Sequence, residues 1–348
     1  MIRKIKNFWH LLEAIFGSIV FGFPGKKLTI IGVTGTDGKT TTANLIHHIL
    51  TTAGFKTCIS STLSGLHTTT PGRWRIQKFL RASLNNGCTH AVLEVSSHAI
   101  DQNRIWGVDF TVGVITNIAD HEHLDYHKTF ENYRKVKLSF LESCKKQADW
   151  RELGNFNFKT KLIGDFNHEN CLAAIAVARE LGINDEIIRQ AVASFEPPPG
   201  RLEIVVRKPF LVIVDFAHTP QAFEKVLPEI KKLGKRLIHV FGCTGDRDRT
   251  KRPIMGAIAE KFDDQIILTH EDTYSEDPRK IIEEIAKGIK MPVLKIMDRK
   301  EAIKLALEQA RPGDVVIITG VGHQKTLNMG GKEIPWSDQK VVKELLND

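Results

Sequence analysis

The sequence has few cysteines, and none of them forms a CxxC pair. Their number is odd, and they are Cys58, Cys88, Cys144, Cys171 and Cys243. This pattern argues against a disulfide framework and against a zinc ribbon, and it is typical of a reducing compartment. We therefore expect a cytoplasmic protein.

The chain also lacks a long basic run, and its aromatic residues are not interleaved with lysine and arginine. Its formal charge is nevertheless +8 and its pI is about 9.1. An excess of this kind fits either a nucleic-acid surface or a site for phosphates. Because the charges are scattered, we expect a phosphate site and no nucleic-acid partner.

No apolar run near the N-terminus reaches the roughly 20 residues that a membrane-spanning helix needs. Residues 8–23 are mostly apolar and follow three basic residues, but His10 and Glu13 interrupt them. No small-residue cleavage site follows, unlike in a signal peptide. Residues 1–25 therefore predict an apolar helix. It either packs on the domain behind it or, through residues 1–24, lies weakly on a membrane surface.

A proline-rich segment divides the chain. The residues Glu196-Pro197-Pro198-Pro199-Gly200 cannot continue a helix and predict a stiff, extended linker. The length of 348 residues fits two or three domains. We therefore place a central domain at 26–196 and a last domain at 197–348.

Strands and helices alternate on both sides of this linker. Before it, we expect strands at 28–33, 91–95 and 112–116 and helices at 39–53, 130–145 and 168–181. After it, we expect strands at 211–215, 236–241, 265–268, 293–296 and 314–318 and helices at 219–233, 252–261, 278–289, 298–310 and 337–346. This alternation predicts an α/β fold. The central domain would be a P-loop domain with a mostly parallel sheet, and the last domain would be Rossmann-like and doubly wound.

The strongest local signal is a glycine-rich loop between the first expected strand and the first expected helix. It consists of Gly35, Thr36, Asp37, Gly38, Lys39, Thr40 and Thr41. Glycines let the backbone N–H groups face an anion, and the helix N-terminus adds a positive dipole. We expect ATP here, with Lys39 on the β- and γ-phosphates and the Thr40 hydroxyl on Mg²⁺. The alternative is a glycine turn followed by a surface lysine, because Val33 replaces the first glycine of the strict GxxxxGK[ST] pattern.

Several separated motifs, taken with this loop, resemble the Mur ligase family. The loop is similar to that family's GTNGKT, with Asp37 in place of the asparagine. The other similar segments are TTP at 69–71, LEVSSHAIDQNR at 93–104, HLDYH at 123–127, PGRLE at 199–203, DFAHTP at 215–220, GCTGDRD at 242–248 and KRP at 251–253. The likeness runs from about residue 28 to the C-terminus. It is strongest to the branch that adds the third residue of the peptidoglycan stem peptide.

The resemblance implies an ATP-dependent ligase that joins an amino acid to a carboxylate of a peptidoglycan precursor such as UDP-MurNAc-peptide. The carboxylate would attack the γ-phosphate to give an acyl phosphate and ADP, and an amine would then displace phosphate. Two divalent ions would balance the charge. Two alternatives remain open: a folylpolyglutamate- or polymer-type ligase, and a non-catalytic nucleotide-binding subunit. The segments EVSSHA and HLDYH favour the cell-wall branch over the former.

The resemblance also assigns residues. The ligands of the Mg²⁺ ions would be Thr40, Glu94, His123 and Lys137, the last as a carbamylated lysine. Without the family, Glu94 could form a surface ion pair, the cluster at 121–127 could suggest zinc, and Lys137 would be a solvated helix lysine. Asn167 and Asn170 would lie near the adenine, or cap a helix, or both.

Further residues are assigned to the substrates. From the last domain, Arg201, Asp215 and His218 would close over the nucleotide. The acceptor would be bound by Thr69, Thr70, Ser97 and Arg104, because arginine suits phosphate or carboxylate. The residues expected to contact the amino acid or acceptor in the last domain are Asp272, Tyr274, Gly320 and Gln324.

The sequence departs from the family in three places. Only about 27 residues precede the first strand, so we expect the domain that holds the UDP group to be absent. Either the acceptor is then a different molecule, or a partner supplies the role of that domain. The region 137–164 is short, so part of the central sheet should be missing and 149–160 should form only a loop. The selectivity motif DNPR reads EDTY at 271–274, and GKGHE reads GVGHQ at 320–324. The incoming amino acid is therefore not predicted.

Overall fold

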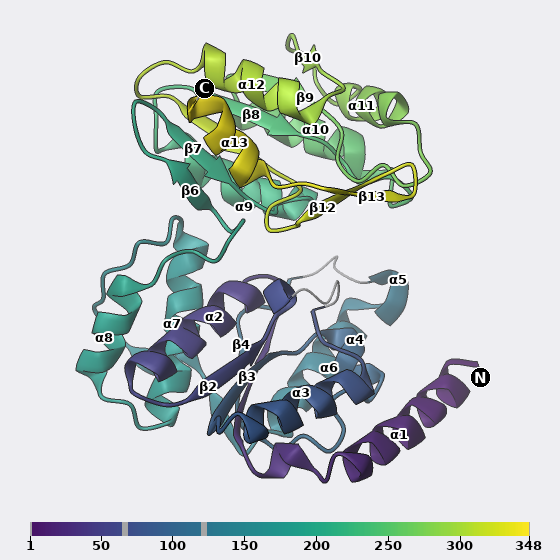
Figure 1. The fold of residues 1–348 in the computed structure, drawn as a ribbon, viewed down its shortest axis with the longest axis vertical. Helices are drawn as coiled ribbons and strands as arrows, with labels where there is room; N and C mark the ends of the chain where they lie inside the picture. Colours follow the sequence, from purple (N-terminus) through teal and green to yellow (C-terminus); the bar gives the residue numbers. More distant parts are fainter. Residues whose placement is uncertain (1, 65–68, 120–123, 348) are drawn as a thin grey trace. The chain divides into compact units, whose positions relative to one another are not determined.

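The computed structural model divides the chain into two compact units (Figure 1). Unit 1 contains residues 1–161 and 166–196, and unit 2 contains residues 162–165 and 197–348. The structure describes residues 2–64, 69–119 and 124–347. Each unit has its own sheet and its own hydrophobic core.

Unit 1 is built on a five-stranded sheet with the order β2-β3-β1-β4-β5, in which all paired strands are parallel. The strands are β1 (Thr29–Thr34), β2 (Thr57–Ser60), β3 (His90–Glu94), β4 (Phe110–Ile115) and β5 (Lys146–Ala148). Because the strands are parallel, their carboxyl ends meet at one edge, where ligands bind in α/β sheets. This edge carries the glycine-rich loop and Glu94.

Eight helices accompany this sheet in the described part of the chain. They are α1 (Ile2–Val20), α2 (Lys39–Thr52), α3 (Arg73–Asn85), α4 (Ser97–Asp101), α5 (Leu124–His127), α6 (Phe130–Glu142), α7 (Asp165–Glu180) and α8 (Asp185–Ser194). Short 3-10 helices lie at η1 (Pro24–Lys26), η2 (Thr62–Ser64) and η3 (Trp150–Leu153). The expectation of only loop at 149–160 is therefore wrong at η3, where the Asp149 side chain accepts a hydrogen bond from the Arg151 N–H and caps a single turn. In the described ranges, no helix has the length and apolar character needed to cross a bilayer.

Unit 2 is built on a six-stranded sheet with the order β10-β9-β8-β11-β7-β6. Its strands are β6 (Glu203–Val206), β7 (Leu211–Val214), β8 (Leu237–Phe241), β9 (Gln265–Leu268), β10 (Leu294–Lys295) and β11 (Val315–Ile318). Only the β6–β7 pair is antiparallel. The accompanying helices are α9 (Pro220–Lys231), α10 (Lys251–Phe262), α11 (Pro278–Ala286), α12 (Arg299–Gln309) and α13 (Asp338–Asn347), and a hairpin is formed by β12 (Thr326–Met329) and β13 (Lys332–Pro335). The predicted α/β class with a largely parallel sheet is confirmed.

A buried ion pair fixes the ends of two strands in unit 2. The guanidinium of Arg299 donates two hydrogen bonds of 2.8 Å to the carboxylate of Asp338, and both side chains are fully buried. The same guanidinium donates to the carbonyls of His270, at 3.3 Å, and Thr319, at 2.9 Å. These two residues follow β9 and β11, so the pair anchors the loops that carry the predicted amino-acid contacts. A paired, fully hydrogen-bonded charge is the form in which burial is tolerated.

The structure contains one disulfide, between Cys58 and Cys88, which differs from the expectation drawn from the cysteine pattern. The two residues are 30 positions apart and form no recognisable motif. Parallel pairing of β2 with β3 nevertheless brings their Cα atoms to 6.4 Å. The pairing is a tertiary property that spacing along the chain does not reveal. The three remaining cysteines are buried and free.

Candidate active site

The glycine-rich loop joins β1 to α2 and is fixed by the end of β4. The backbone N–H of Asp37 donates to Asn117 Oδ1 at 3.0 Å, and the Thr116 hydroxyl donates to the Asp37 carbonyl at 2.6 Å. Gly38 has a φ of 79°, and a Cβ there would lie 2.0 Å from Asn170 Oδ1. A Cβ at Gly35 would lie 1.8 Å from the Thr116 hydroxyl oxygen. Both glycines are therefore required by close approach, and the loop has a defined, curled backbone.

The ammonium group of Lys39 lies over this loop. It donates to the carbonyl of Gly35 at 2.8 Å and to that of Thr36 at 2.7 Å. The lysine is the first residue of α2, so its charge adds to the positive end of the helix dipole. Lys39 is therefore held against the loop, unlike the surface lysine of the alternative interpretation. The lysine charge and the helix N-terminus together suit an anion such as a phosphate.

Glu94 ends β3 and is buried, with 1% of its surface exposed. The Thr40 hydroxyl donates to its Oε2 at 3.2 Å. Thr62 donates from its backbone N–H to Oε1 at 2.9 Å and from its hydroxyl to Oε2 at 3.0 Å. The interpretation of Glu94 as a surface ion-pair residue is therefore wrong. A hydroxyl and a carboxylate in contact supply the oxygen ligands that Mg²⁺ prefers.

The third predicted metal ligand, His123, lies outside the described residues. Within the described ranges, no group of three or more histidine, cysteine, aspartate and glutamate side chains is arranged to hold a metal ion. Thr40 and Glu94 are thus the part of the predicted metal site that the structure brings together.

Lys137 is buried in α6, with 1% of its surface exposed. Its Nζ lies 4.6 Å from the centre of the Tyr133 ring, one turn earlier in the same helix. The Tyr133 hydroxyl is 2.9 Å from the Thr36 hydroxyl, so this side chain connects Lys137 to the phosphate loop. The alternative of a solvated helix lysine is wrong. Spacing alone could not show this, because burial depends on how α6 packs.

The predicted acceptor residues gather beside Glu94. The Thr70 hydroxyl donates to the Glu94 carbonyl at 2.9 Å, and Arg104 Nη1 donates to the Thr70 carbonyl at 3.1 Å. The Ser97 hydroxyl is 3.0 Å from His127 Nε2. Thr69, the residue before Thr70, is half-buried. Three of the four predicted residues therefore take part in polar contacts at this edge of the sheet.

Asn167 and Asn170 lie in the first two turns of α7, and neither precedes the helix. Asn170 Nδ2 donates to Asn167 Oδ1 at 2.9 Å, and the Thr42 hydroxyl is 3.4 Å from Asn170 Oδ1. Because α7 begins at Asp165, neither asparagine is an N-cap, and that alternative is wrong. The pair contacts α2 directly behind the glycine-rich loop.

Several residues of this edge were not predicted from the sequence. Thr62 follows β2, a strand that the sequence did not indicate, and Tyr133 lies in the helix expected at 130–145 without an assigned role. Asn117 follows β4, which was expected at 112–116. The general rule that ligands bind at the carboxyl ends of parallel strands could have identified Asn117, and also Thr62 once β2 was recognised.

In unit 2, the three residues predicted to contact the nucleotide lie around Phe216. The carboxylate of Asp215 accepts hydrogen bonds from the N–H groups of Leu202, at 2.8 Å, and Ala217, at 2.7 Å. Burial raises the pKa of Asp215, while Arg201 acts in the opposite direction. The Arg201 guanidinium lies 4.8 Å from the Phe216 ring, and His218 Nδ1 is 2.8 Å from the Phe216 carbonyl.

A fourth residue, His323, belongs to the same group and was not chosen from the sequence. Its ring centre is 4.8 Å from that of Phe216. Burial lowers the pKa of His323 to about 4, and the charges of Arg201 and His218 act in the same direction. The imidazole is therefore neutral at physiological pH. The sequence could have indicated His323, because it lies in the GVGHQ segment that corresponds to the GKGHE motif.

The residues expected to contact the amino acid or acceptor come together in part. Asp272 Oδ2 accepts a hydrogen bond of 3.4 Å from Gln324 Nε2. A Cβ at Gly320 would lie 2.6 Å from Glu271 Cδ, so this glycine closes on the same loop. The ring of Tyr274 lies instead beside the Arg247 guanidinium, at 5.7 Å.

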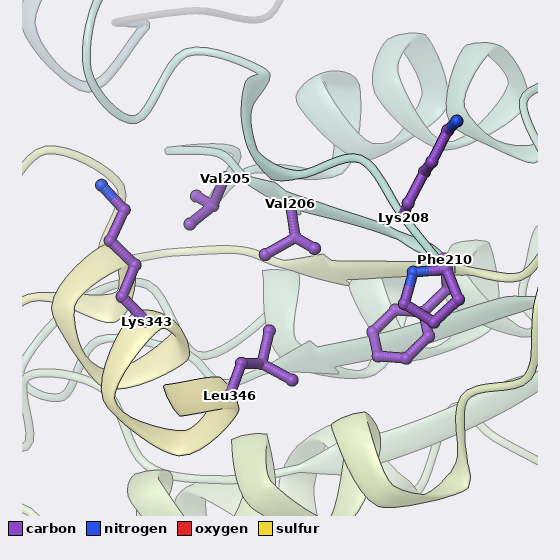
Figure 2. Close-up of a pocket in the computed structure, with 7 residues that line it drawn as sticks. Val205, Val206, Lys208, Phe210, Lys343 and Leu346 are labelled. Atoms are coloured by element: carbon purple, nitrogen blue, oxygen red, sulfur yellow. The ribbon is translucent and has the colours of Figure 1, made fainter. Parts of the chain in front are cut away.

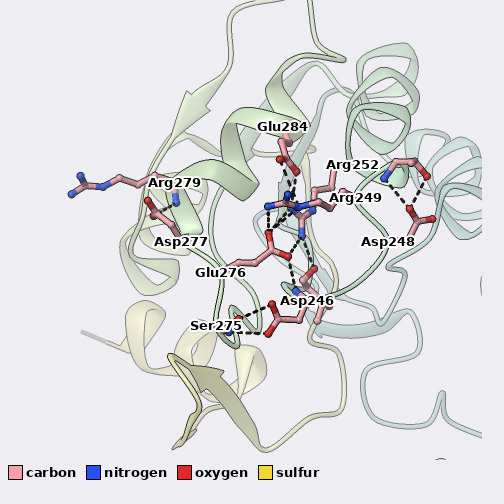
Figure 3. Close-up of polar contacts among 11 residues, drawn as sticks. Asp246, Asp248, Arg249, Arg252, Ser275, Glu276, Asp277, Arg279 and Glu284 are labelled. Atoms are coloured by element: carbon pink, nitrogen blue, oxygen red, sulfur yellow. Dashed lines mark hydrogen bonds and ion pairs between the residues drawn. The ribbon is translucent and has the colours of Figure 1, made fainter.

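An ion-pair network holds the loop that carries these residues (Figure 3). The fully buried guanidinium of Arg252 donates to both oxygens of Glu276, at 2.9 and 3.0 Å, and to Glu284 at 2.6 Å. Hydrogen bonding from Arg252 lowers the pKa of Glu276 to about 2. Glu276 also accepts from the N–H of Asp246 at 2.6 Å, and Asp246 accepts from Ser275. The loop before α11 is thereby tied to the loop before α10.

A cavity of about 370 Å³ lies at the outer edge of the second sheet (Figure 2). It is mostly apolar, and the residues labelled in its lining are Val205, Val206, Lys208, Phe210, Lys343 and Leu346. None of the predicted site residues lines it. We therefore do not assign the catalytic chemistry to this cavity.

Comparison with known proteins shows the family. The chain matches the Mur ligase middle domain over residues 33–150 and the Mur ligase, glutamate ligase domain over residues 200–322. It is 39% identical to the UDP-N-acetylmuramoyl-L-alanyl-D-glutamate--2,6-diaminopimelate ligase of Aquifex aeolicus, over 94% of this chain and 79% of that protein. It is 37% identical to the protein of the same name from Syntrophomonas wolfei, over 96% of this chain and 81% of that protein.

Solved structures give the same result. A structure of a UDP-N-acetylmuramoyl-L-alanyl-D-glutamate--2,6-diaminopimelate ligase matches with a TM-score of 0.62 and 30% identity, over 92% of this chain and 78% of that one. A bifunctional folylpolyglutamate synthase/dihydrofolate synthase from Yersinia pestis, complexed with AMPPNP and Mn ion, shares the fold with a TM-score of 0.69 and 19% identity, over 89% of this chain and 90% of that one. The chain belongs to the Mur ligase family.

Proposed function

We propose that this protein joins an amino acid to a carboxylate of a peptidoglycan precursor, such as UDP-MurNAc-peptide, and converts ATP to ADP and phosphate. The relatives from Aquifex aeolicus and Syntrophomonas wolfei carry names of ligases of this kind. The observation that carries the proposal is the arrangement of Lys39, Thr40 and Glu94 at one sheet edge, beside a curled glycine loop.

The nucleotide would be held mainly by the loop. Its backbone N–H groups, the start of α2 and the Lys39 ammonium together offer the positive charge that a triphosphate needs. Asn167 and Asn170 would lie near the adenine, directly behind the loop. Arg201 and His218, with Asp215 holding their loop, would contact the nucleotide from unit 2.

The residues present fit Mg²⁺. Thr40 and Glu94 supply oxygen atoms, and we propose His123 as a further ligand. A bound Mg²⁺ would neutralise charge on the phosphates as the bond to the γ-phosphate breaks. Burial of Glu94 limits competition from water for this carboxylate.

We further propose that Lys137 is carbamylated. Lys137 is almost fully buried, and its Nζ lies 4.6 Å from the centre of the Tyr133 ring. The proposal is supported by the resemblance to the family, whose lysine in this segment is carbamylated. Addition of carbon dioxide to the neutral amine forms an N–C bond and releases a proton, and the product is an anion. That anion would be a ligand for a second Mg²⁺, on the side of the loop where Tyr133 meets Thr36.

The reaction would run in two steps. An oxygen of the acceptor carboxylate, held by Thr69, Thr70, Ser97 and Arg104, attacks the γ-phosphorus, and the bond to the β-phosphate oxygen breaks to release ADP. The amine of the incoming amino acid then attacks the acyl carbon, and phosphate leaves with the C–O bond electrons. Asp272, Tyr274, Gly320 and Gln324 would contact the incoming amino acid or the acceptor. Preorganised cations stabilise the charge that develops in both steps.

Product analysis tests the proposal. The full chain is incubated with ATP, Mg²⁺, a panel of UDP-linked muropeptides and a panel of amino acids. We expect ADP, phosphate and a new amide in a one-to-one-to-one ratio. AMP with pyrophosphate would exclude this chemistry, and tight ATP binding without turnover would favour a non-catalytic nucleotide-binding subunit.

A further inference from the structure

Helix α1 exposes its large apolar side chains. Those of Phe8, Trp9 and Phe16 are 57, 65 and 59% exposed. The exposed apolar residues of this helix are Phe8, Trp9, Leu12, Phe16, Ile19 and Val20. Their spacing of three and four places them on one side of the helix. A helix that faced only water would carry charged residues there.

The opposite side of α1 is small and polar, and it faces the protein. Ala14 and Ser18 are buried, and the Ser18 hydroxyl is 3.3 Å from the Trp106 carbonyl. Asn7 Nδ2 donates to the carbonyl of Asp101 at 2.9 Å. These contacts fix the rotation of the helix, so the apolar stripe is held outward and is not free to turn into the core.

The neighbouring helix α3 lies against α1 and is basic (Figure 1). Together the two helices contain seven lysine and arginine residues and one acidic residue, Glu13, which pairs with Arg73 at 3.2 Å. Arg75 and Lys78 are exposed, and Trp74 between the helices is partly exposed, with its ring 5.7 Å from that of Phe16. We call the exposed surface formed by Phe8, Trp9, Phe16, Trp74, Arg75 and Lys78 the α1–α3 face.

We propose that the α1–α3 face docks on an anionic membrane surface and that the acceptor carboxylate is presented there on a lipid-linked precursor. Aromatic residues beside cations match the interfacial region of a bilayer with anionic headgroups, where apolar burial and charge attraction add. A second copy of this chain would bring two basic faces together, which like charges oppose. The lipid surface is therefore the occupant that the charges favour.

Arg73, the residue before Trp74 in α3, connects this helix to the proposed acceptor site, and this part of the inference rests on the proposed function. Arg73 Nη2 donates to the Gln102 carbonyl at 2.8 Å. Gln102 Oε1 accepts from Arg104 Nη2 at 2.8 Å, and Arg104 in turn donates to Thr70. A precursor anchored in the same membrane would therefore be presented beside this edge of the sheet.

Flotation with protein-free vesicles tests the docking. The full chain should float with vesicles of phosphatidylglycerol and phosphatidylcholine, and much less with phosphatidylcholine alone. The variant Phe8→Ser/Trp9→Ser/Phe16→Ser should lose about 10-fold or more in the bound-to-free ratio. The matched control is Leu233→Ser/Leu294→Ser/Ile334→Ser, which removes three exposed apolar side chains of unit 2 and should bind like the wild type.

A second variant keeps the test independent of the aromatic residues. Arg75→Glu/Lys78→Glu should weaken binding to the anionic vesicles and should abolish most of its salt dependence. Absence of flotation, or flotation unaffected by both variants, would overturn the docking. The docking would also be overturned if the wild type formed a dimer that the triple α1 variant does not form and bound no vesicles. Binding of the wild type to native membranes but not to pure lipid would overturn it as well. These last two outcomes would indicate a second copy or a protein partner.

The substrate part is tested with one peptide in two forms. At matched concentration, the wild type should ligate the peptide on a lipid in anionic vesicles about 10-fold faster or more than its free UDP-linked form. The triple α1 variant should show the wild-type rate on the free form only. Equal wild-type rates on both forms would overturn the lipid-linked acceptor. Flotation with no amide from either form would instead contradict the proposed function while leaving the docking intact.

Discussion

Replacement of Gly38 by alanine tests the phosphate loop through a single methyl group. Gly38 has a φ of 79°, and the added Cβ would meet Asn170 Oδ1 at 2.0 Å and Cγ at 2.8 Å. The Asn170 amide would have to move, and with it the 2.9 Å hydrogen bond to Asn167 and the 3.4 Å contact with Thr42. The curled backbone that should face the phosphates would change together with the residues proposed to lie near the adenine.

The size of the effect follows from two contributions. A left-handed backbone with a Cβ costs about 1–2 kcal/mol. Each buried hydrogen bond that is lost adds about 1 kcal/mol. Gly38→Ala should therefore lower the free energy of unfolding by about 2–4 kcal/mol. Because the distortion lies at the proposed phosphate contacts, the affinity for ATP should also fall by about 10-fold or more.

Gly54→Ala is the matched control. Gly54 ends the same helix, α2, with a φ of 85°, and a Cβ there has nothing within 4 Å. It should cost only the backbone contribution of about 1–2 kcal/mol, with unchanged ATP affinity. Urea denaturation measures the stability of both variants, and titration calorimetry with a non-hydrolysable ATP analogue measures binding. Equal affinity of Gly38→Ala and Gly54→Ala would refute the assignment of the loop.

Three further predictions concern buried charges. Lys137→Ala should abolish ligation, and a short-chain carboxylate should restore part of it, whereas Lys135→Ala, at an exposed position of the same helix, should leave the rate unchanged; full activity of Lys137→Ala would dismiss the carbamate. Arg252→Met should lower the free energy of unfolding by about 3 kcal/mol in urea denaturation, because it removes the buried guanidinium shared by Glu276 and Glu284 and leaves them only the exposed Arg249. A loss below about 0.5 kcal/mol would contradict the role of the network. Hydrogen bonding from Arg252 holds the pKa of Glu276 at about 2 in the folded protein, below its ordinary value of 4.5, so its contribution to stability is complete above pH 4.5 and is lost as the pH falls towards 2. We plot the free energy of unfolding against pH. Between these two pH values the slope should be smaller for Arg252→Met than for the wild type, and identical slopes would contradict this attribution.

Parts of the fold with a clear apolar run were predictable from the sequence, and the others were not. The expected strand at 265–268 coincides with β9, and the expected strand at 236–241 differs from β8 by one residue. The edge strand β2 was missed because Thr57 to Ile59 are only half-buried and the strand is mixed in polarity. The hairpin of β12 and β13 was missed because its outer strand is polar and exposed. Such strands are stabilised by pairing, which has no local signature.

A site residue could be predicted where its role depends on its position at the end of a strand or the start of a helix. Glu94 could be placed because it ends a buried strand, and Lys39 because it begins the helix after a glycine loop. Thr62 and Tyr133 act through contacts between elements far apart in the sequence, at separations of 32 and 97 residues. The Arg252 network joins loops in the same way. The spacing of apolar residues along the chain does not predict contacts between distant elements, so these contacts could be identified only from the structure.

The transfer of oxygen from the acceptor carboxylate to phosphate tests the central claim most directly. The acceptor is prepared with heavy oxygen in the carboxylate, and the phosphate released during ligation by the full chain is analysed by mass spectrometry. If the carboxylate attacks the γ-phosphate beside Lys39, Thr40 and Glu94, each released phosphate carries one heavy oxygen atom and the nucleotide product is ADP. Phosphate without the label, or AMP with labelled acceptor oxygen, would contradict the account.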